Sequence, residues 1–369
     1  MRNTRIKAIP HDKQMTNWLS DRLDKICKLD TYVRPERIKD SIKLDANENF
    51  ALDDKFISKI ALHAIKQTDL REYPLEQFED LYRQLSNYSG VDKKYLGIGS
   101  GSDQIIEMIL SIFGRNQQAS IFTPTFSYFI NRCELHDVAL VRVPLTRDDN
   151  ELPKLEFLKR ATQSDIVYIC SPNNPTGNQF GEGLVLEIID RLKDKLILID
   201  EAYVEFGNYS LASHIAKYDN VVILRTLSKA FGLAGARIGY LIANEKFAEI
   251  FRTTIQSPYP LNSFSLAVAT LALSHHGYVR QTVELIKRER KRVFEELFDM
   301  KGIKVFRSDA NFIFLESYDN YGRILSVLKK EGLSVKAFGD LDGHRGCIRV
   351  TIGTSEMNNK FLKSISKAI

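Results

Sequence analysis

The chain has 369 residues, of which 44% are apolar and 27% charged, and this is the composition of a globular protein with one large or two modest domains. Its net charge of +5 is spread along the chain, which excludes a basic stripe of the kind that binds nucleic acid. No apolar run approaches the roughly 20 residues that a membrane-spanning helix requires.

The cysteines suggest a reducing environment. Cys27, Cys133, Cys170 and Cys347 are too few for a disulfide framework and lack the spacing of a metal site. We therefore expect reduced thiols and no metal. The basic residues 1–10 are not followed by the apolar stretch of a secretory signal, which favours a cytoplasmic location.

Residues 1–30 are predicted to form an N-terminal extension with one amphipathic helix. From about residue 95, short apolar runs alternate with helical patterns, which predicts an α/β domain with a mainly parallel sheet covered on both faces. From about residue 261 the pattern changes to a smaller α+β domain with a long charged helix near 278–297. The predicted strands are 119–122, 166–170, 196–199, 221–224, 238–242, 304–306 and 311–315, and the other predicted helices are 104–113 and 184–192.

Polar motifs follow several of the predicted strands. Ligands of open α/β sheets bind outside the carboxyl ends of the strands, so we expect these motifs to lie together. The segment Gly99–Gln104 joins a short strand to a helix whose first N–H groups would face an anion. It lacks the glycine pattern of a dinucleotide site, and a helix start without a ligand is the alternative.

The next two motifs carry an aromatic ring and an amide. Phe126 could stack on a cofactor ring, or belong to the core. Asn174, next to Pro175, is a fixed donor suited to a phenolate oxygen, although the segment 171–177 is also typical of a turn.

A carboxylate follows the strand at 196–199. Asp200, placed near a pyridine nitrogen, would keep that nitrogen protonated, and a protonated ring is the electron sink of pyridoxal-phosphate chemistry. Tyr203 could reach the phenolic oxygen of the same ring. The alternative is that Asp200 only caps a helix.

The segment 225–237 is the most informative one. Lys229 lies just past the carboxyl end of the strand at 221–224, where a lysine can form a Schiff base with a carbonyl cofactor. Thr226, Ser228 and Arg237 could hold a phosphate beside it. A strand-to-helix turn with a solvated lysine is the alternative.

Arg349 lies within an apolar strand pattern near the C-terminus. If this face is buried, the guanidinium requires an anionic partner, and a carboxylate or phosphate fits its planar fork. A solvated arginine on an edge strand is the alternative.

Together these motifs resemble the class I and II aminotransferases, which are fold-type I pyridoxal-phosphate enzymes, and among them the histidinol-phosphate aminotransferases. The resemblance extends from about Leu29 to the C-terminus. It implies a homodimer that transfers the amine of L-histidinol phosphate to 2-oxoglutarate in histidine biosynthesis, giving imidazole acetol phosphate and L-glutamate. The motifs, in the order of the family, are 44–49, 71–74, 101–103, 171–177, 200–206, 225–240, 308–312 and 349–354.

The resemblance also implies roles for single residues. Lys229 would hold the cofactor and shuttle a proton, and Asp200 would pair with the ring nitrogen. Asn174 and Tyr203 would bond the phenolic oxygen, and Phe126 would stack on the ring, where the family often has tyrosine.

Binding of the cofactor phosphate and of the substrate is implied in the same way. Tyr73 would reach the cofactor of the neighbouring subunit, which makes a dimer obligatory. The residues implied to hold the phosphate are Ser102 and Asp103, through their backbone N–H groups, and Thr226, Ser228 and Arg237. The residues implied to line the substrate site are Tyr32, Asn49, Lys336 and Arg349.

Two positions depart from the family. Phe50 stands where the family usually has proline, and Lys336 stands where bacterial members have a second phosphate-binding arginine, 13 residues before Arg349. Lysine keeps the charge but loses the planar fork. An aromatic amino-acid aminotransferase and a pyridoxal-phosphate-dependent decarboxylase of a phosphorylated amino acid therefore stay open as alternatives. A transcription regulator of this fold is disfavoured, since the N-terminal residues are too few for a DNA-binding domain.

The expected division of the chain has four parts. They are an N-terminal extension (1–30), a substrate arm with part of the small domain (31–60), a large cofactor-binding domain (61–260) and a small C-terminal domain (261–369).

Overall fold

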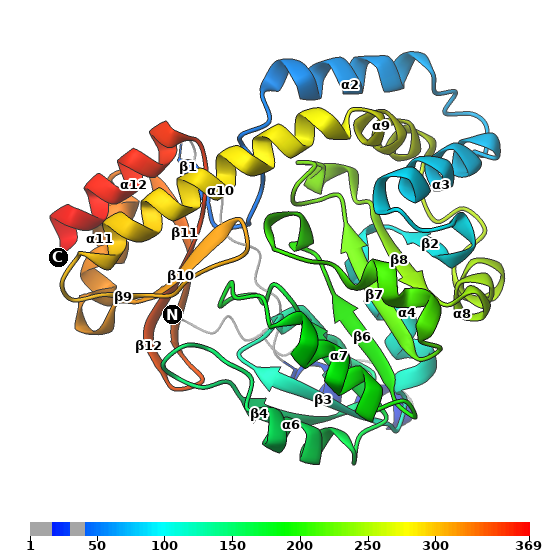
Figure 1. Ribbon diagram of the computed structural model, residues 1–369, viewed down its shortest axis with the longest axis horizontal. Coiled ribbons are helices and arrows are strands. Elements are labelled where there is room, and N and C mark those ends of the chain that lie inside the picture. Colours follow the sequence, from blue (N-terminus) through cyan, green and yellow to red (C-terminus); the bar gives the residue numbers. More distant parts are fainter. Residues whose placement is uncertain (1–16, 30–40) are drawn as a thin grey trace.

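The computed structural model describes residues 17–29 and 41–369 and contains two sheets. Figure 1 shows the larger sheet in cyan to yellow-green and the smaller one mainly in orange and red. The strands of the larger sheet are β2 (Leu96–Gly99), β3 (Gln118–Thr123), β4 (Ala139–Pro144), β5 (Ile166–Cys170), β6 (Leu196–Asp200), β7 (Val221–Thr226) and β8 (Gly239–Ala243).

The larger sheet has the strand order β2-β8-β7-β6-β5-β3-β4. Neighbouring strands from β7 to β4 are parallel, whereas β8 is antiparallel to both β7 and β2. Every residue of β5, β7 and β8 is buried. Because successive side chains of a strand point to opposite faces, this burial requires that both faces are covered. The predicted mainly parallel α/β fold is confirmed.

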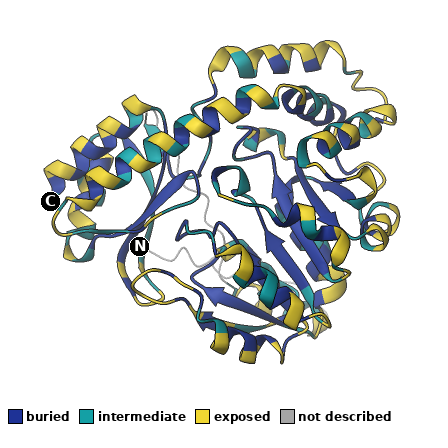
Figure 2. Ribbon diagram, viewed as in Figure 1, coloured by how far each residue is buried: buried dark blue, intermediate teal, exposed yellow. Residues whose placement is uncertain are grey.

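Helices cover this sheet and show an exposed and a buried side, in contrast to the dark strands of Figure 2. The predicted helix at 104–113 begins earlier, at Gly101, and its last turn widens into a π-helix over Leu110–Gly114. The helices that follow these strands are α4 (Gly101–Ile109), α5 (Ser127–Leu135), α6 (Lys154–Ala161), α7 (Glu182–Arg191) and α8 (Glu245–Ile250).

A group of longer helices joins the two halves of the molecule. The helix α9 (Ser263–Ser274) packs against α2 (Asp54–Lys66) and α3 (Glu76–Ser89). The helix α10 (His276–Phe298) then runs from α9 to the small sheet, as Figure 1 shows in yellow. Its buried residues, which include Val279, Val283, Ile286, Val293 and Leu297, recur at helical spacing along one side, as expected for the long charged helix predicted here.

The smaller sheet has the order β1-β11-β12-β10-β9 and combines both ends of the chain. The N-terminal strand β1 pairs in parallel with β11, while β12 is antiparallel to β11 and β10. We propose that this sheet and its helices form the small domain, with a contribution from residues 41–60; the rest of the expected substrate arm, 31–40, lies outside the described residues. Its elements are β1 (Ile42–Leu44), β9 (Lys304–Val305), β10 (Phe312–Glu316), β11 (Leu333–Leu341), β12 (His344–Thr351), α11 (Tyr321–Lys330) and α12 (Ser355–Ala368).

The predicted N-terminal helix is present as α1 (Asn17–Ile26), but none of its residues is buried. Trp18, on its expected apolar face, is exposed. Arg22 forms an exposed ion pair of 2.9 Å with Asp137, which follows α5. Of the helices in the described part of the chain, none has the length and apolar character needed to cross a membrane.

Candidate active site

The predicted polar motifs lie at the carboxyl edge of the larger sheet. Asp200 is the last residue of β6 and Thr226 is the last residue of β7, and these two strands are parallel neighbours. The carboxyl ends of parallel strands meet at one edge, so the groups that follow β5, β6 and β7 gather there.

Lys229 follows β7 and points into the protein. Its Nζ donates to the carbonyl oxygen of Ala46 at 3.0 Å and lies 5.7 Å from the centre of the Tyr203 ring. Burial, with a smaller contribution from the positive charge of Arg349, lowers the pKa of the Lys229 amine to about 8. This lysine is therefore not a solvated turn residue, and about a tenth of it is an uncharged nucleophile at pH 7 and about half at pH 8.

Asp200 is a buried carboxylate held by two donors. Its Oδ1 accepts from the N–H of Ala202 at 3.0 Å, and its Oδ2 accepts from the hydroxyl of Tyr168 at 2.7 Å. No helix of the described chain begins at Asp200, so the capping alternative is wrong. Burial raises the pKa of the Asp200 carboxyl to about 6, against the lowering effect of the Tyr168 hydrogen bond. Among the described residues no basic side chain forms an ion pair with it.

Tyr203 meets a residue that sequence reasoning missed. The amide nitrogen of Asn47 donates to the Tyr203 hydroxyl oxygen at 2.9 Å, and both side chains are buried. The backbone of Asn47 is left-handed, with φ of 56°, and its N–H donates to the hydroxyl oxygen of Thr351 at 2.9 Å. Asn47 thus connects β12 of the small sheet to the active-site tyrosine.

A cradle forms where α4 begins. Gly101 has φ of 79°, and no side chain caps the first N–H groups of α4, which include those of Ser102 and Asp103. A Cβ atom at Gly101 would lie 2.5 Å from a guanidinium nitrogen of Arg237, and one at Gly239 would lie 2.3 Å from the backbone nitrogen of Ser102. The chain therefore keeps these two positions free of side chains. The Arg237 guanidinium also donates to Asp103 at 2.9 Å.

Two hydroxyl groups lie close together near this cradle, since Thr226 pairs with Gly239 in the sheet register. The Oγ1 atom of Thr226 lies 2.9 Å from the Oγ of Ser228 and accepts from the N–H of Ser228 at 3.1 Å. Both side chains are buried. Together with Arg237 and the start of α4, they are a donor set suited to a phosphate.

These residues fit pyridoxal phosphate. The cradle offers uncapped N–H groups, hydroxyls and a guanidinium to a phosphate dianion. Asp200 is a buried carboxylate whose ionised form a cationic ring nitrogen would stabilise, and Lys229 is an amine with a lowered pKa. The three parts match the phosphate, the ring nitrogen and the carbonyl carbon of one molecule.

Arg349 lies on β12 and reaches the large domain. Its guanidinium donates to the side-chain oxygen of Asn174 at 2.5 Å and to the carbonyl oxygen of Asp45 at 2.7 Å. The rings of Phe312 and Phe338 lie 5.2 Å and 6.0 Å from it. Because the side chain is buried, the alternative of a solvated edge-strand arginine is wrong.

Lys336 stands directly opposite Arg349 in the register of β11 and β12. Its Nζ lies 5.8 Å from the centre of the Phe338 ring. Burial and the neighbouring Arg349 charge lower the pKa of Lys336, and Asp45 opposes this effect. Two cations side by side at a half-buried place favour an anion between them.

Three of the predicted residues, Phe126, Tyr73 and Asn49, show no geometry in the described structure that is directed toward a ligand. Phe126 is half-buried just before α5, and Tyr73 is exposed and stacks on Tyr259 with ring centres 4.4 Å apart. The amide of Asn49 donates to the carbonyl oxygen of Ala230 at 2.7 Å, so it supports the segment after Lys229. Tyr32 lies outside the described residues.

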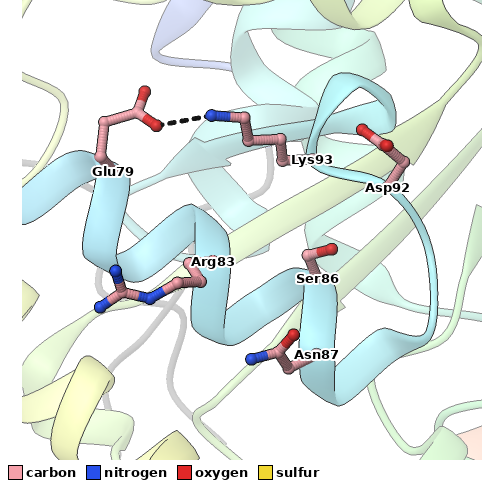
Figure 3. A pocket seen from close by; sticks show the side chains of 6 residues that line it. All are labelled: Glu79, Arg83, Ser86, Asn87, Asp92 and Lys93. Atoms are coloured by element: carbon pink, nitrogen blue, oxygen red, sulfur yellow. Dashed lines mark hydrogen bonds and ion pairs between the residues drawn. The ribbon is translucent and has the colours of Figure 1, made fainter.

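A separate hollow of about 400 Å³ lies on α3 and the segment before β2. Figure 3 shows its polar lining, in which Lys93 forms an ion pair of 2.8 Å with Glu79. It contains none of the predicted site residues. It is lined by Glu79, Arg83, Ser86, Asn87, Asp92 and Lys93.

Comparison with known proteins agrees with this geometry. The profile of the family described as aminotransferase class I and II matches residues 39–365. The curated histidinol-phosphate aminotransferase of Ruminiclostridium cellulolyticum is 35% identical over 329 residues, which are 88% of this chain and 91% of the relative. The crystal structure of the histidinol-phosphate aminotransferase from Clostridium acetobutylicum superimposes with a TM-score of 0.80 at 26% identity, over 88% of this chain and 98% of that one.

A second solved structure supports the fold. The histidinol-phosphate aminotransferase from Sinorhizobium meliloti, in complex with pyridoxal-5'-phosphate, superimposes with a TM-score of 0.81 at 20% identity and covers 98% of each chain.

Proposed function

Because the chain belongs to the class I and II aminotransferases, we propose that its active site transfers the amine of L-histidinol phosphate to 2-oxoglutarate in histidine biosynthesis. The chain is a pyridoxal-phosphate-dependent aminotransferase. The observation that carries the choice of donor is the pair of cations formed by Lys336 and Arg349 on neighbouring strands.

The cofactor would be held by the groups described above. Bound pyridoxal phosphate supplies a carbonyl that receives the amine and a ring that takes up the electron pair of the broken C–H bond. Asp200 would hold a proton on the ring nitrogen by charge pairing, and the cradle at Ser102 and Arg237 would fix the phosphate. Tyr203 and Asn174 would orient the phenolic oxygen.

Lys229 would hold the cofactor and move the proton. Its lowered pKa, about 8, allows the amine to release a proton and to take one up within the pH range of the cytosol. The Ala46 carbonyl oxygen directs the amine by a hydrogen bond of 3.0 Å, and the centre of the Tyr203 ring lies 5.7 Å from the amine.

The two cations suit a phosphate dianion on the donor. One guanidinium leaves part of a dianion unpaired, and Lys336 provides the second positive charge beside Arg349. The carboxylate of 2-oxoglutarate would use Arg349 in the return half of the reaction. The rings of Phe312 and Phe338, 5.2 Å and 6.0 Å from the Arg349 guanidinium, would hold it in place for the anion.

We also propose a homodimer in the cytoplasm. Tyr73 and Leu75 are exposed near the stacked Tyr259 ring, and such an apolar group is suited to contact with a second copy. Cys27, Cys133, Cys170 and Cys347 are free, which supports a reducing compartment.

A screen of the first half-reaction tests the proposed donor. The cofactor-loaded protein is mixed with histidinol phosphate, phenylalanine, tyrosine or phosphothreonine in separate stopped-flow runs, and the change in visible absorbance of the cofactor is recorded. We expect histidinol phosphate to react with the highest second-order rate constant and 2-oxoglutarate to restore the starting spectrum. Release of carbon dioxide from phosphothreonine would instead support the decarboxylase, and a faster reaction of phenylalanine would support the aromatic aminotransferase.

A further inference from the structure

We infer that Tyr168 is a positioning residue, which acts on the cofactor ring through Asp200. This inference rests on the proposed pairing of Asp200 with the ring nitrogen. Tyr168 lies on β5, next to β6, and is two residues before Cys170, which pairs with Asp200 in the sheet register. Its side chain therefore lies on the same face of β5 as that of Cys170.

The contact between Tyr168 and Asp200 is buried and short. The Tyr168 hydroxyl donates to Oδ2 of Asp200 at 2.7 Å, and both side chains are almost entirely shielded from solvent. Hydrogen bonds to a carboxylate in such surroundings are stronger than those between neutral groups. The hydroxyl thus limits how the carboxylate turns.

The Tyr168 ring is itself held in place. It stacks on Phe129 of α5, with ring centres 3.8 Å apart and an angle of 10° between the planes. The second oxygen of Asp200 accepts from the Ala202 N–H at 3.0 Å. Each carboxylate oxygen therefore has one fixed donor, and the carboxylate is oriented before a ligand arrives.

Tyr168 also influences when Asp200 is ionised. Its hydrogen bond favours the ionised carboxylate and opposes the burial that raises the pKa of Asp200. The other titratable groups around Asp200 are Cys170 on β5, Asp103 on α4, and Glu201 and Tyr203 on its own segment. Burial and the Asp200 charge raise the pKa of the Tyr168 hydroxyl well above its usual value, so it remains a donor throughout the working pH range.

The variant Tyr168→Phe tests this role, since it removes the hydroxyl and keeps the ring on Phe129. The affinity for pyridoxal phosphate is measured by fluorescence titration of the cofactor-free protein between pH 6 and pH 8. We expect a loss of at least about tenfold at pH 6 and a smaller loss at pH 8. The sign follows because the lost bond raises the pKa of Asp200, which becomes neutral at a higher pH than in the wild type.

Two further variants make the result specific. Tyr209→Phe removes a hydroxyl that donates to the Phe180 carbonyl oxygen at 2.6 Å and not to the Asp200 carboxylate, and it serves as the control for thermal stability. Asp200→Asn removes the charge through which Tyr168 is inferred to act. In the Asp200→Asn background, Tyr168→Phe should cause little further loss of affinity.

The outcomes are distinguishable. If Tyr168→Phe lowers the melting temperature as Tyr209→Phe does but binds the cofactor with the wild-type affinity and pH dependence, the hydroxyl is only structural and the inference is wrong. The inference is also wrong if Tyr168→Phe lowers the cofactor affinity by the same factor in the Asp200→Asn background as in the wild type. If Asp200→Asn alone keeps wild-type affinity and rate, the proposed role of Asp200 fails instead.

Discussion

The guanidinium of Arg349 donates to the side-chain oxygen of Asn174 at 2.5 Å, which joins β12 of the small sheet to the loop after β5 of the large sheet. The amide oxygen of Asn174 is thereby occupied. Its NH₂ group is left to donate, and this is the group that a phenolate oxygen requires. The bond therefore sets the orientation of the amide and couples the proposed substrate anion site to the proposed cofactor site.

The variant Arg349→Ala is expected to impair both half-reactions, because the phosphate of the donor and the carboxylate of 2-oxoglutarate would share this guanidinium. We expect kcat/KM to fall at least about tenfold for each substrate, because a tenfold loss corresponds to the free energy of one charge-assisted hydrogen bond. Single-turnover kinetics measure the two halves separately. Arg345→Ala is the matched control, since Arg345 lies on the same strand but is exposed and pairs with Asp319 at 3.1 Å. Equal losses of kcat/KM in Arg349→Ala and Arg345→Ala would contradict the proposed role of Arg349 in binding the substrate anion.

The variant Lys229→Ala is expected to abolish transamination. The segment between β7 and β8 contains no other lysine, so the covalent link to the cofactor and the proton transfer are both lost. The protein should still fold and bind pyridoxal phosphate through the cradle. Denaturing mass spectrometry after borohydride reduction should find the cofactor attached to the wild type and absent from the variant. Turnover at the wild-type rate would refute the role of Lys229.

The pH dependence of cofactor attachment follows from the lowered pKa of Lys229. Only the neutral amine attacks the cofactor carbonyl, so the attachment rate should rise about tenfold per pH unit up to about 8 and then level off. Rapid mixing of the cofactor-free protein with pyridoxal phosphate measures this rate. An attachment rate that continues to rise toward pH 10 would mean that Lys229 behaves as an ordinary solvated lysine.

The position of the candidate site at the carboxyl ends of the strands could be predicted from the sequence. The strands β5, β6 and β7 are continuous apolar runs, and polar residues follow each of them. Lys229 and Asp200 were predicted in this way, whereas Arg349 was predicted as an arginine within an apolar strand pattern. The structure excludes a solvated lysine, a helix-capping aspartate and a solvated edge-strand arginine at these three positions. The hydrogen-bond partner of Tyr203 could not be predicted from such a strand pattern. Asn47 reaches it only because its backbone has φ of 56°, a property that no local pattern distinguishes from that of Asn49.

Tyr168 was overlooked for a related reason. In the sequence it is one more apolar strand residue, and its hydroxyl becomes meaningful only through the register that places β5 beside β6. The opposition of Lys336 and Arg349 likewise depends on the pairing of β11 with β12. Register between strands is a tertiary property and does not follow from the pattern of either strand alone.

A mixture of the Tyr73→Phe and Lys229→Ala variants tests whether Tyr73 acts across a dimer. In a mixed dimer of Tyr73→Phe and Lys229→Ala chains, the site with an intact Lys229 would receive an intact Tyr73 from the other subunit. We expect the mixture to bind the cofactor at that site with wild-type affinity and to exceed the activity of either variant alone. A mixture no more active than the Tyr73→Phe protein would show that the tyrosine serves its own chain.

The proposed donor is tested most directly by kcat/KM for histidinol phosphate and for phenylalanine in the wild type and in Lys336→Ala. We expect the wild type to prefer histidinol phosphate. Lys336→Ala should reduce kcat/KM for histidinol phosphate at least about tenfold. It should reduce kcat/KM for phenylalanine much less, because a single carboxylate can be held by Arg349 alone. Equal losses for both donors, or a wild type that prefers phenylalanine, would contradict the proposal and assign the site to an aromatic aminotransferase.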